Sequence, residues 1–166
     1  MKNKVSAIPT GYRSITPYLT VNNAAQAMEF YKKAFGAIEE MRFEGPGGKI
    51  GHAELKIGDS KIMLSDEFPE MDIKGPQTQG SSPVAIHLYI EDVDSVVQKA
   101  VALGAKIIRP ADDKFYGDRS ATLQDPYGHT WNVATHIEDV SVDEVQKRAS
   151  TQGKILLNLV IPKENR

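Results

Sequence analysis

Two stretches of the sequence repeat one pattern, and this repeat decides the fold. Residues 18–37 read YLTVNNAAQAMEFYKKAFGA, and residues 87–105 read HLYIEDVDSVVQKAVALGA. Each begins as a strand, continues as a helix with apolar residues at i, i+3, i+4 and i+7, and ends near a glycine, Gly36 or Gly104. An asparagine or aspartate before each helix can accept hydrogen bonds from its free N–H groups. The repeat therefore predicts two copies of one unit.

A predicted β-hairpin follows each helix. Residues 52–57 (HAELKI) alternate polar and apolar side chains, turn at Gly58–Asp59 and return at residues 61–64. In the second copy, two alternating runs flank the turn DPYG at residues 125–128. We therefore expect an α+β fold of two βαβββ units that form a cup-shaped, partly open barrel sheet.

The predicted units form a single domain, and a further segment follows it. The domain spans about residues 12–140, with its repeats at about 12–67 and 84–140. Residues 68–83 are rich in Pro, Gly, Gln and Ser and predict an exposed linker. Residues 141–166 begin with a capping box, Ser141 to Glu144, which predicts a short helix to about Ala149. The tail after Gly153 adds a strand or forms an arm that docks elsewhere.

Composition and charge exclude several classes of protein. The formal net charge is -2 and the basic residues are scattered, which argues against a nucleic-acid partner. The absence of cysteine excludes disulfides, thiolate catalysis and cysteine-ligated zinc. No apolar leader follows the first lysines, and the run Ile155–Ile161 is too short to span a membrane. We therefore expect a cytoplasmic protein.

Strand alternation places different chemistry on the two faces of the predicted sheet. One face is apolar and suits packing against helices, while the other carries polar and aromatic groups, including three of the four histidines. A curved sheet around a small-molecule pocket accounts for this better than a wet face or a dimer surface, which are the alternatives. The side chains of the polar face include Thr16, Tyr18, Thr20, His52, Glu54, Lys56, His87, Tyr89, Thr130, Asn132 and His136.

Three blocks of sequence also resemble a known family. The stretch GHAELKIGD at 51–59, the run FYGDR at 115–119 and the block DPYGHTW at 125–131 are similar to the vicinal oxygen chelate superfamily. The resemblance is greatest to its PhnB-like, glyoxalase/bleomycin-resistance branch and covers about residues 12–140. It implies a small-molecule ligand held in the cup and a homodimer that completes it. The C-terminal tail is a candidate for contacts across that dimer.

The resemblance also bears on metal binding. Metal enzymes of the family take ligands from four strands, and the matching positions here are Thr16, Glu54, Ala85 and Asn132. Only Glu54 is of the family's ligand type, whereas a stable divalent site needs three or four converging His or carboxylate groups. The resemblance therefore implies a metal-free binder of a flat or charged molecule, with no cofactor. The alternative is a lyase, isomerase or dioxygenase using a divalent metal on His52, Glu54 and His87.

Each candidate residue also has a structural interpretation. Glu54 fits a solvated carboxylate, His52 and His87 fit hydrogen-bonded structural residues, and Arg119 fits a residue that fixes a loop. A dimer whose cup binds nothing is the third functional hypothesis. No catalytic residue is predicted. The predicted ligand-binding residues are His52, Glu54, His87, Tyr89, Tyr116, Arg119 and Asn132.

Overall fold

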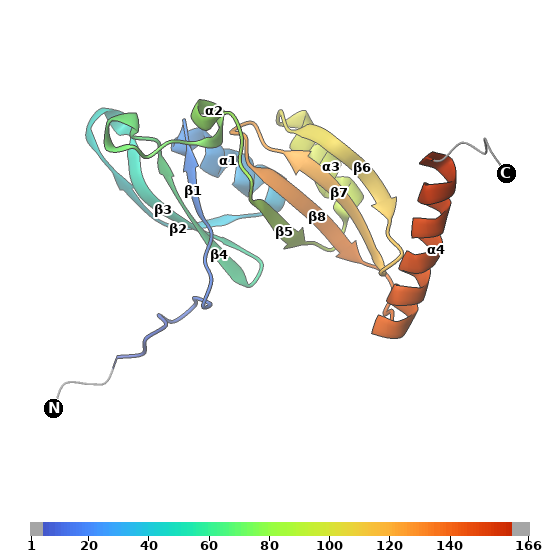
Figure 1. Ribbon diagram of the computed structural model, residues 1–166. Helices are drawn as coiled ribbons and strands as arrows, with labels where there is room; N and C mark the ends of the chain where they lie inside the picture. Colours follow the sequence, from blue (N-terminus) through green and yellow to red (C-terminus); the bar gives the residue numbers. More distant parts are fainter. Residues whose placement is uncertain (1–4, 161–166) are drawn as a thin grey trace.

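The computed structural model describes the backbone of residues 5–160 and the side chains of residues 5–153. Two four-stranded sheets lie side by side, each built in the order strand, helix and three further strands (Figure 1). The first unit contains β1 (Tyr18–Val21), α1 (Ala24–Phe35), β2 (Ile38–Glu44), β3 (Ile50–Ile57) and β4 (Ser60–Asp66). The second contains β5 (Ala85–Tyr89), α3 (Val93–Ala102), β6 (Lys106–Asp113), β7 (Asp118–Gln124) and β8 (Thr130–His136).

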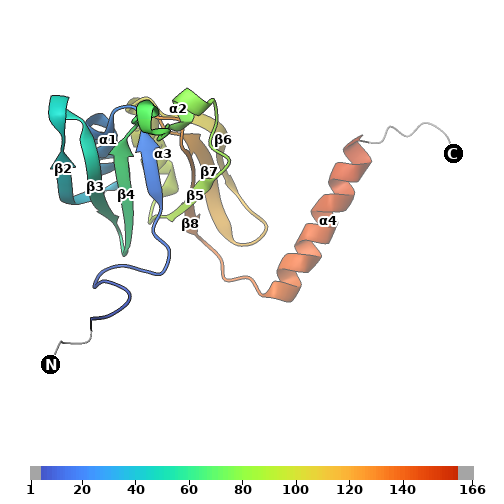
Figure 2. The same ribbon diagram turned by 60° about the vertical axis from the view of Figure 1, so that its left-hand side comes forward.

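Both sheets have the same topology. The strand order is β1-β4-β3-β2 in the first and β5-β8-β7-β6 in the second. The first strand of each unit runs parallel to the last, and all other neighbours are antiparallel. Figure 2 shows β1 and β5 at the adjoining edges of two open sheets, which do not close into a barrel. The predicted α+β fold of two βαβββ units is confirmed.

Both helices begin and end as the sequence predicts. The side chain of Asn23 accepts a hydrogen bond from the N–H of Gln26, and that of Asp92 accepts one from Ser95. These bonds satisfy N–H groups that have no partner within the helix. α1 ends at Gly36, whose φ of 69° is in the left-handed region that glycine enters without strain.

One apolar core lies between the sheets and the two helices, which pack against each other. Leu55 and Ile57 of β3, like Trp131 and Val133 of β8, point toward the helices and are buried. This confirms the faces predicted from alternation. The aromatic residues of the core lie where the two units meet: Phe30, Tyr31 and Phe35 of α1, and Tyr127 and Trp131 of the second unit.

The buried carboxylate of Asp125 joins the two units. Its Oδ1 accepts hydrogen bonds from the backbone N–H groups of Tyr127 and His129, which shape the DPYG turn. Its Oδ2 accepts bonds from the Tyr31 hydroxyl at 2.7 Å and from the Trp131 indole N–H at 2.9 Å. Burial, and then the charge of Asp125, raises the pKa of Tyr31 well above its ordinary value. The Tyr31 hydroxyl therefore remains a donor at any physiological pH.

The linker is more ordered than its composition predicts. Residues 68–83 contain the short turn Pro69–Met71 and the short helix α2 (Pro76–Gln79). Glu67 anchors them by accepting hydrogen bonds from the N–H of Gly75 and the hydroxyl of Thr78. Gly75 also passes so close to β1 that a Cβ there would lie 2.9 Å from the carbonyl oxygen of Thr20. The linker is therefore packed on the first unit.

The C-terminal helix is longer than predicted. α4 (Val142–Val160) continues through Gly153, so the strand considered for the tail does not form within residues 154–160. A single glycine inside a helix costs about 1 kcal/mol and ends the helix only where the chain turns into the left-handed region. Figures 1 and 2 show α4 projecting away from both sheets. Residues 161–166 of the predicted arm lie outside the described residues.

Replacing Asp125 by Ala should lower the free energy of unfolding by about 3 kcal/mol or more, because the buried donors of Tyr31 and Trp131 lose their acceptor. Urea denaturation followed by far-UV circular dichroism measures this loss. Asp59, in an exposed hairpin turn, provides the control, since Asp59→Ala should change stability by less than about 0.5 kcal/mol. Similar losses in both variants would contradict the role of Asp125.

Candidate functional site

The candidate site is the sheet face turned away from α1 and α3, which we call the open face. In the first unit it carries Tyr18, His52, Glu54 and Lys61, because their strand neighbours point into the core. In the second it carries His87, Tyr89, Asp118, Asn132 and His136, again in alternation with core residues. Within the described residues, every buried side-chain nitrogen and oxygen has a hydrogen-bond partner. The open face is therefore held by its own contacts.

In the first unit, these side chains form a continuous chain of contacts. The Tyr18 hydroxyl lies 2.9 Å from Nδ1 of His52, and Nε2 of His52 lies 3.5 Å from Oε1 of Glu54. The other oxygen of Glu54 lies 3.5 Å from Nζ of Lys61. The Tyr12 hydroxyl has the largest influence on the pKa of Glu54 and lowers it; His52 and Lys61 lower it further, against the effect of burial. Glu54 is therefore ionised at neutral pH.

In the second unit, a buried aspartate organises the open face. Oδ2 of Asp118 accepts a hydrogen bond from the Tyr89 hydroxyl at 2.9 Å, and its Oδ1 lies 2.8 Å from Nδ1 of His136. The side chain of Asp118 is 5% exposed and that of His136 is 52% exposed. Asp118, followed by Asp139, raises the pKa of His136. A histidine held in this way can donate, accept or exchange a proton with a bound molecule.

The glycine of the FYGDR run makes this arrangement possible. Gly117 has a φ of 97°, and a Cβ there would lie 2.1 Å from the carbonyl oxygen of Glu138. The carbonyl oxygen of Gly117 accepts hydrogen bonds from the N–H groups of Ile137 and Glu138. The chain leaving β8 is therefore held against the turn before β7, next to the strand register that pairs His136 with Asp118. Only glycine permits so close an approach with this backbone conformation.

Two further predicted residues lie on the same sheet. The His87 ring lies 4.8 Å from that of Tyr89 between centroids, and both side chains are exposed. The Asn132 side-chain oxygen accepts a hydrogen bond from the Thr122 hydroxyl at 2.9 Å, which leaves the amide N–H groups to face a ligand. The structure therefore brings His87, Tyr89 and Asn132 onto one face, as the sequence predicts.

In the part of the chain that the structure describes, the remaining predicted residues make no hydrogen bond to these clusters. Arg119 points to the opposite side of β7, where it pairs with Asp94 of α3 and Asp113 of β6. These contacts give Arg119 a structural role, although they tie a helix and a strand together rather than fixing a loop. Tyr116 lies in the turn between β6 and β7, is 39% exposed and packs edge to face on Phe115. We therefore leave Arg119 and Tyr116 out of the candidate site.

The residues present do not fit a divalent metal. Among the side chains of residues 5–153, no three His, Asp or Glu groups converge as metal ligands must. The alternative set His52, Glu54 and His87 is thus not assembled. Of the family's ligand positions, Glu54 already faces Lys61, and the Asn132 oxygen already accepts from Thr122.

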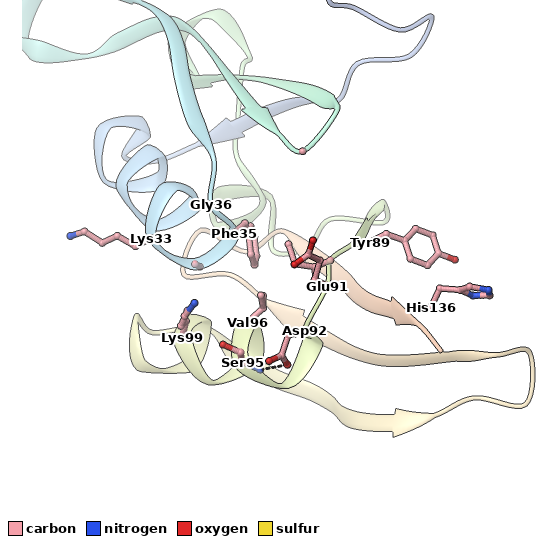
Figure 3. Close-up of a pocket in the computed structure, with 13 residues that line it drawn as sticks. Lys33, Phe35, Gly36, Tyr89, Glu91, Asp92, Ser95, Val96, Lys99 and His136 are labelled. Atoms are coloured by element: carbon pink, nitrogen blue, oxygen red, sulfur yellow. Dashed lines mark hydrogen bonds between the residues drawn. The ribbon is translucent and has the colours of Figure 1, made fainter. Parts of the chain in front are cut away.

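Two cavities lie near the candidate residues, one at the open face and one between the two helices. One of about 540 Å³ lies between the N-terminal segment and the first sheet, and Tyr12, Glu54 and Met63 line it. The other, of about 760 Å³, lies between the end of α1 and the start of α3. Figure 3 shows Phe35 and Val96 inside this second cleft, with Tyr89 and His136 at one end and pointing away from it. Both volumes are in the range of small-molecule sites.

Sequence reasoning missed four residues of the site: Tyr12, Lys61, Asp118 and His136. Asp118 is the first residue of β7, and alternation along the strand from that residue places it on the open face. Strand alternation predicts the correct face for His136 but does not predict that it contacts Asp118. Tyr12 meets Lys61 only because the N-terminal segment folds back over β4, with the ammonium 4.2 Å from its ring centroid. No local sequence pattern predicts that contact.

The fold defines the class as a paired βαβββ protein with one uncovered, polar sheet face. The profile of the Glyoxalase/Bleomycin resistance protein/Dioxygenase superfamily matches residues 13–133, and the chain belongs to this superfamily. An uncharacterised Mycobacterium bovis protein, Mb0911c, is 40% identical over 143 residues, which cover 84% of this chain and 94% of that protein.

Solved structures share the fold. The Arabidopsis thaliana At5g48480 gene product matches with a TM-score of 0.60 at 26% identity, covering 74% of this chain and 98% of its own. The PhnB protein from Bacillus cereus also matches with a TM-score of 0.60, at 19% identity, covering 74% of this chain and 99% of its own. At that identity the second likeness concerns the fold alone. No helix within residues 5–160 is long and apolar enough to cross a membrane.

The contact between Asp118 and His136 predicts a pH-dependent stability. Because the pKa of His136 is raised in the folded protein, its contribution is complete below the unfolded value of about 6.5 and is lost as the pH rises through the folded pKa. Replacing His136 by Gln should therefore cost more stability at about pH 6 than at about pH 8.5. Urea denaturation at both pH values measures the difference.

An NMR titration tests the cause of that shift. Asp118→Asn should lower the midpoint of the His136 imidazole, because the charge that favours the imidazolium is gone. Asp112→Asn, on the neighbouring strand, is the control, since Asp112 does not hydrogen-bond His136. An unchanged midpoint in Asp118→Asn would refute the electrostatic coupling.

Proposed function

We propose that this protein binds a small, flat or charged molecule on its open face, without a resident metal ion. The observation that carries the proposal is the set of aromatic rings and hydrogen-bonding groups that share this face. Tyr18 and Tyr89, both more than half exposed, offer rings for stacking, while His52, His136 and Asn132 offer polar atoms. An apolar or aromatic surface with a few placed polar groups is typical of small-molecule sites.

The open face is the better candidate of the two surfaces that carry cavities. Its polar groups sit on strands and are fixed by hydrogen bonds to one another, so they need little reordering when a ligand binds. The cleft between α1 and α3 is instead rimmed by Lys33, Glu91 and Lys99, whose exposed side chains pair with no partner among the described residues. Tyr89 and His136 border both, so an extended ligand on the open face would reach this cleft.

We further propose that the protein belongs to the PhnB-like branch of its superfamily. The support is in the sequence: the run FYGDR at 115–119 and the block DPYGHTW at 125–131. Their key residues have clear structural tasks, since Gly117 and Asp118 position His136 and Asp125 joins the units. A binding or sequestering protein fits these residues better than a metal-dependent enzyme.

The binding proposal can be tested with 8-anilinonaphthalene-1-sulfonate, a flat anionic aromatic probe. Its fluorescence should rise to saturation with the folded wild-type protein. The variant Tyr18→Ala/Tyr89→Ala should bind it about tenfold more weakly, because each aromatic contact contributes about 0.5–1.5 kcal/mol. Val101→Ala, at an exposed position of α3 on the other side of the sheets, should bind like the wild type. Equal affinity in the double variant would rule out the open face.

We also propose that the protein is a homodimer. Strand β6 is an exposed sheet edge with Ile107 and Ile108 about half exposed, and edges of this kind pair readily with another chain. α4 projects from the domain, held near its start by the ion pairs of Arg148 with Glu138 and Glu144. The sequence of its last turns, from Ile155 to Val160, is apolar and suits contact with a second copy.

Light scattering of the full chain should therefore give a mass near twice 18.3 kDa. Deleting residues 153–166 should weaken the dimer and shift the mass toward the monomer on dilution, because the apolar turns of α4 are lost. A monomeric mass at tens of micromolar wild-type protein would contradict the dimer. An unchanged dimer after the deletion would contradict only the role of α4.

A further inference from the structure

A lysine lies enclosed on the open face beside the buried carboxylate of Glu54. The side chain of Lys61 is 13% exposed, and its Nζ lies 2.6 Å from Oε2 of Glu40 and 3.5 Å from Oε2 of Glu54. The same ammonium lies over the ring of Tyr12, 4.2 Å from its centroid. Lysine is seldom this buried unless it is paired, so these contacts fix both its charge and its position.

We propose that the ammonium group of Lys61 occupies the space around Glu54 that a divalent cation would need, so that the open face works without a metal. Glu54 is the one residue of the family's ligand type at the matched positions, and it is the carboxylate that Lys61 contacts. The inference rests on the proposed use of the open face for binding. The inference concerns the positive charge that Lys61 supplies beside Glu54, and it says nothing about which molecule the open face binds.

Both carboxylate oxygens of Glu54 already face other groups. One carboxylate oxygen faces His52 and the other faces Lys61, while the Tyr12 hydroxyl also lies close. A divalent ion at Glu54 would meet a fixed positive charge within a few ångströms, where repulsion between like charges is strong and weakly screened. The ion would also have to compete for Glu40, which the same ammonium already contacts.

The N-terminal segment keeps Lys61 in place. Gly11 passes over the lysine with a φ of 84°, and a Cβ there would lie 3.4 Å from Cε of Lys61. The next residue, Tyr12, covers the ammonium with its ring and lines the cavity of about 540 Å³ together with Glu54. The lysine therefore cannot swing into solvent and vacate the site unless this segment lifts away.

Calorimetric titration with MnCl₂ tests the proposal on the full chain. The wild type should show no saturable Mn²⁺ binding, and EDTA should not change its melting temperature. Lys61→Met leaves Glu40, Glu54 and His52 facing a vacated position and should show saturable Mn²⁺ binding, with a matching rise in melting temperature. Adding Glu54→Gln to this variant should abolish the gain.

Lys56→Met is the matched control, since Lys56 pairs directly across from Lys61 on β3 but contacts neither carboxylate; it should behave like the wild type. If Lys61→Met does not fold, Lys61→Gln takes its place. Saturable Mn²⁺ binding by the wild type, or no gain in the folded Lys61 variant, would overturn the proposal. Because the readout is Mn²⁺ and not the fluorescent probe, failure here is distinguishable from failure of the binding proposal.

Discussion

The carboxylate of Asp125 accepts four hydrogen bonds, one of which, from Tyr31, ties the first unit to the second. Two of them shape the turn between β7 and β8, and two come from large buried aromatic residues, Tyr31 of the first unit and Trp131 of the second. A buried carboxylate is costly unless all its lone pairs are satisfied, so it permits one arrangement of these groups and penalises others. The relative placement of α1 and the second sheet follows from this constraint.

A hydrogen bond from the first turn of each helix to the last strand of its unit fixes that helix on its own sheet. The N–H of Ala24, at the start of α1, donates to the buried Asp66 at the end of β4, and the N–H of Val93, at the start of α3, donates to the hydroxyl of Thr135 in β8. In both units the last strand therefore fixes the first turn of the helix. The helices occupy one side of each sheet, and the other side remains open for polar chemistry.

The two halves of the open face have diverged in charge although their backbones repeat. In the first unit, Glu54 is balanced by Lys61, a cation that stays charged at physiological pH. In the second, Asp118 is balanced by His136, whose charge changes with pH near neutrality. A ligand spanning both halves would thus meet one constant and one variable charge. This asymmetry is set by single side chains on a symmetric scaffold.

The sequence by itself determined the repeat, the helix caps, the hairpin turns and the face to which most strand residues point. These features depend on local preferences, such as alternation along a strand or a glycine at a helix end. A few neighbouring residues are enough to show such preferences. It also placed His52, Glu54, His87, Tyr89 and Asn132 on the face that the structure leaves open. It did not locate the edge strands β2 and β6, whose exposed residues follow no clear alternation.

Only the tertiary structure decided which of these groups meet. Lys61 reaches Glu40 and Glu54 because β4 lies beside β3 and the N-terminal segment folds over both. His136 faces Asp118 because the register of β7 and β8 pairs these two residues, while Arg119, next along the chain, turns to the other side. The sequence likewise did not predict that α4 continues through Gly153. Such contacts depend on strand order and chain crossing, which set distances between residues far apart in sequence, and local preferences carry no information about those distances.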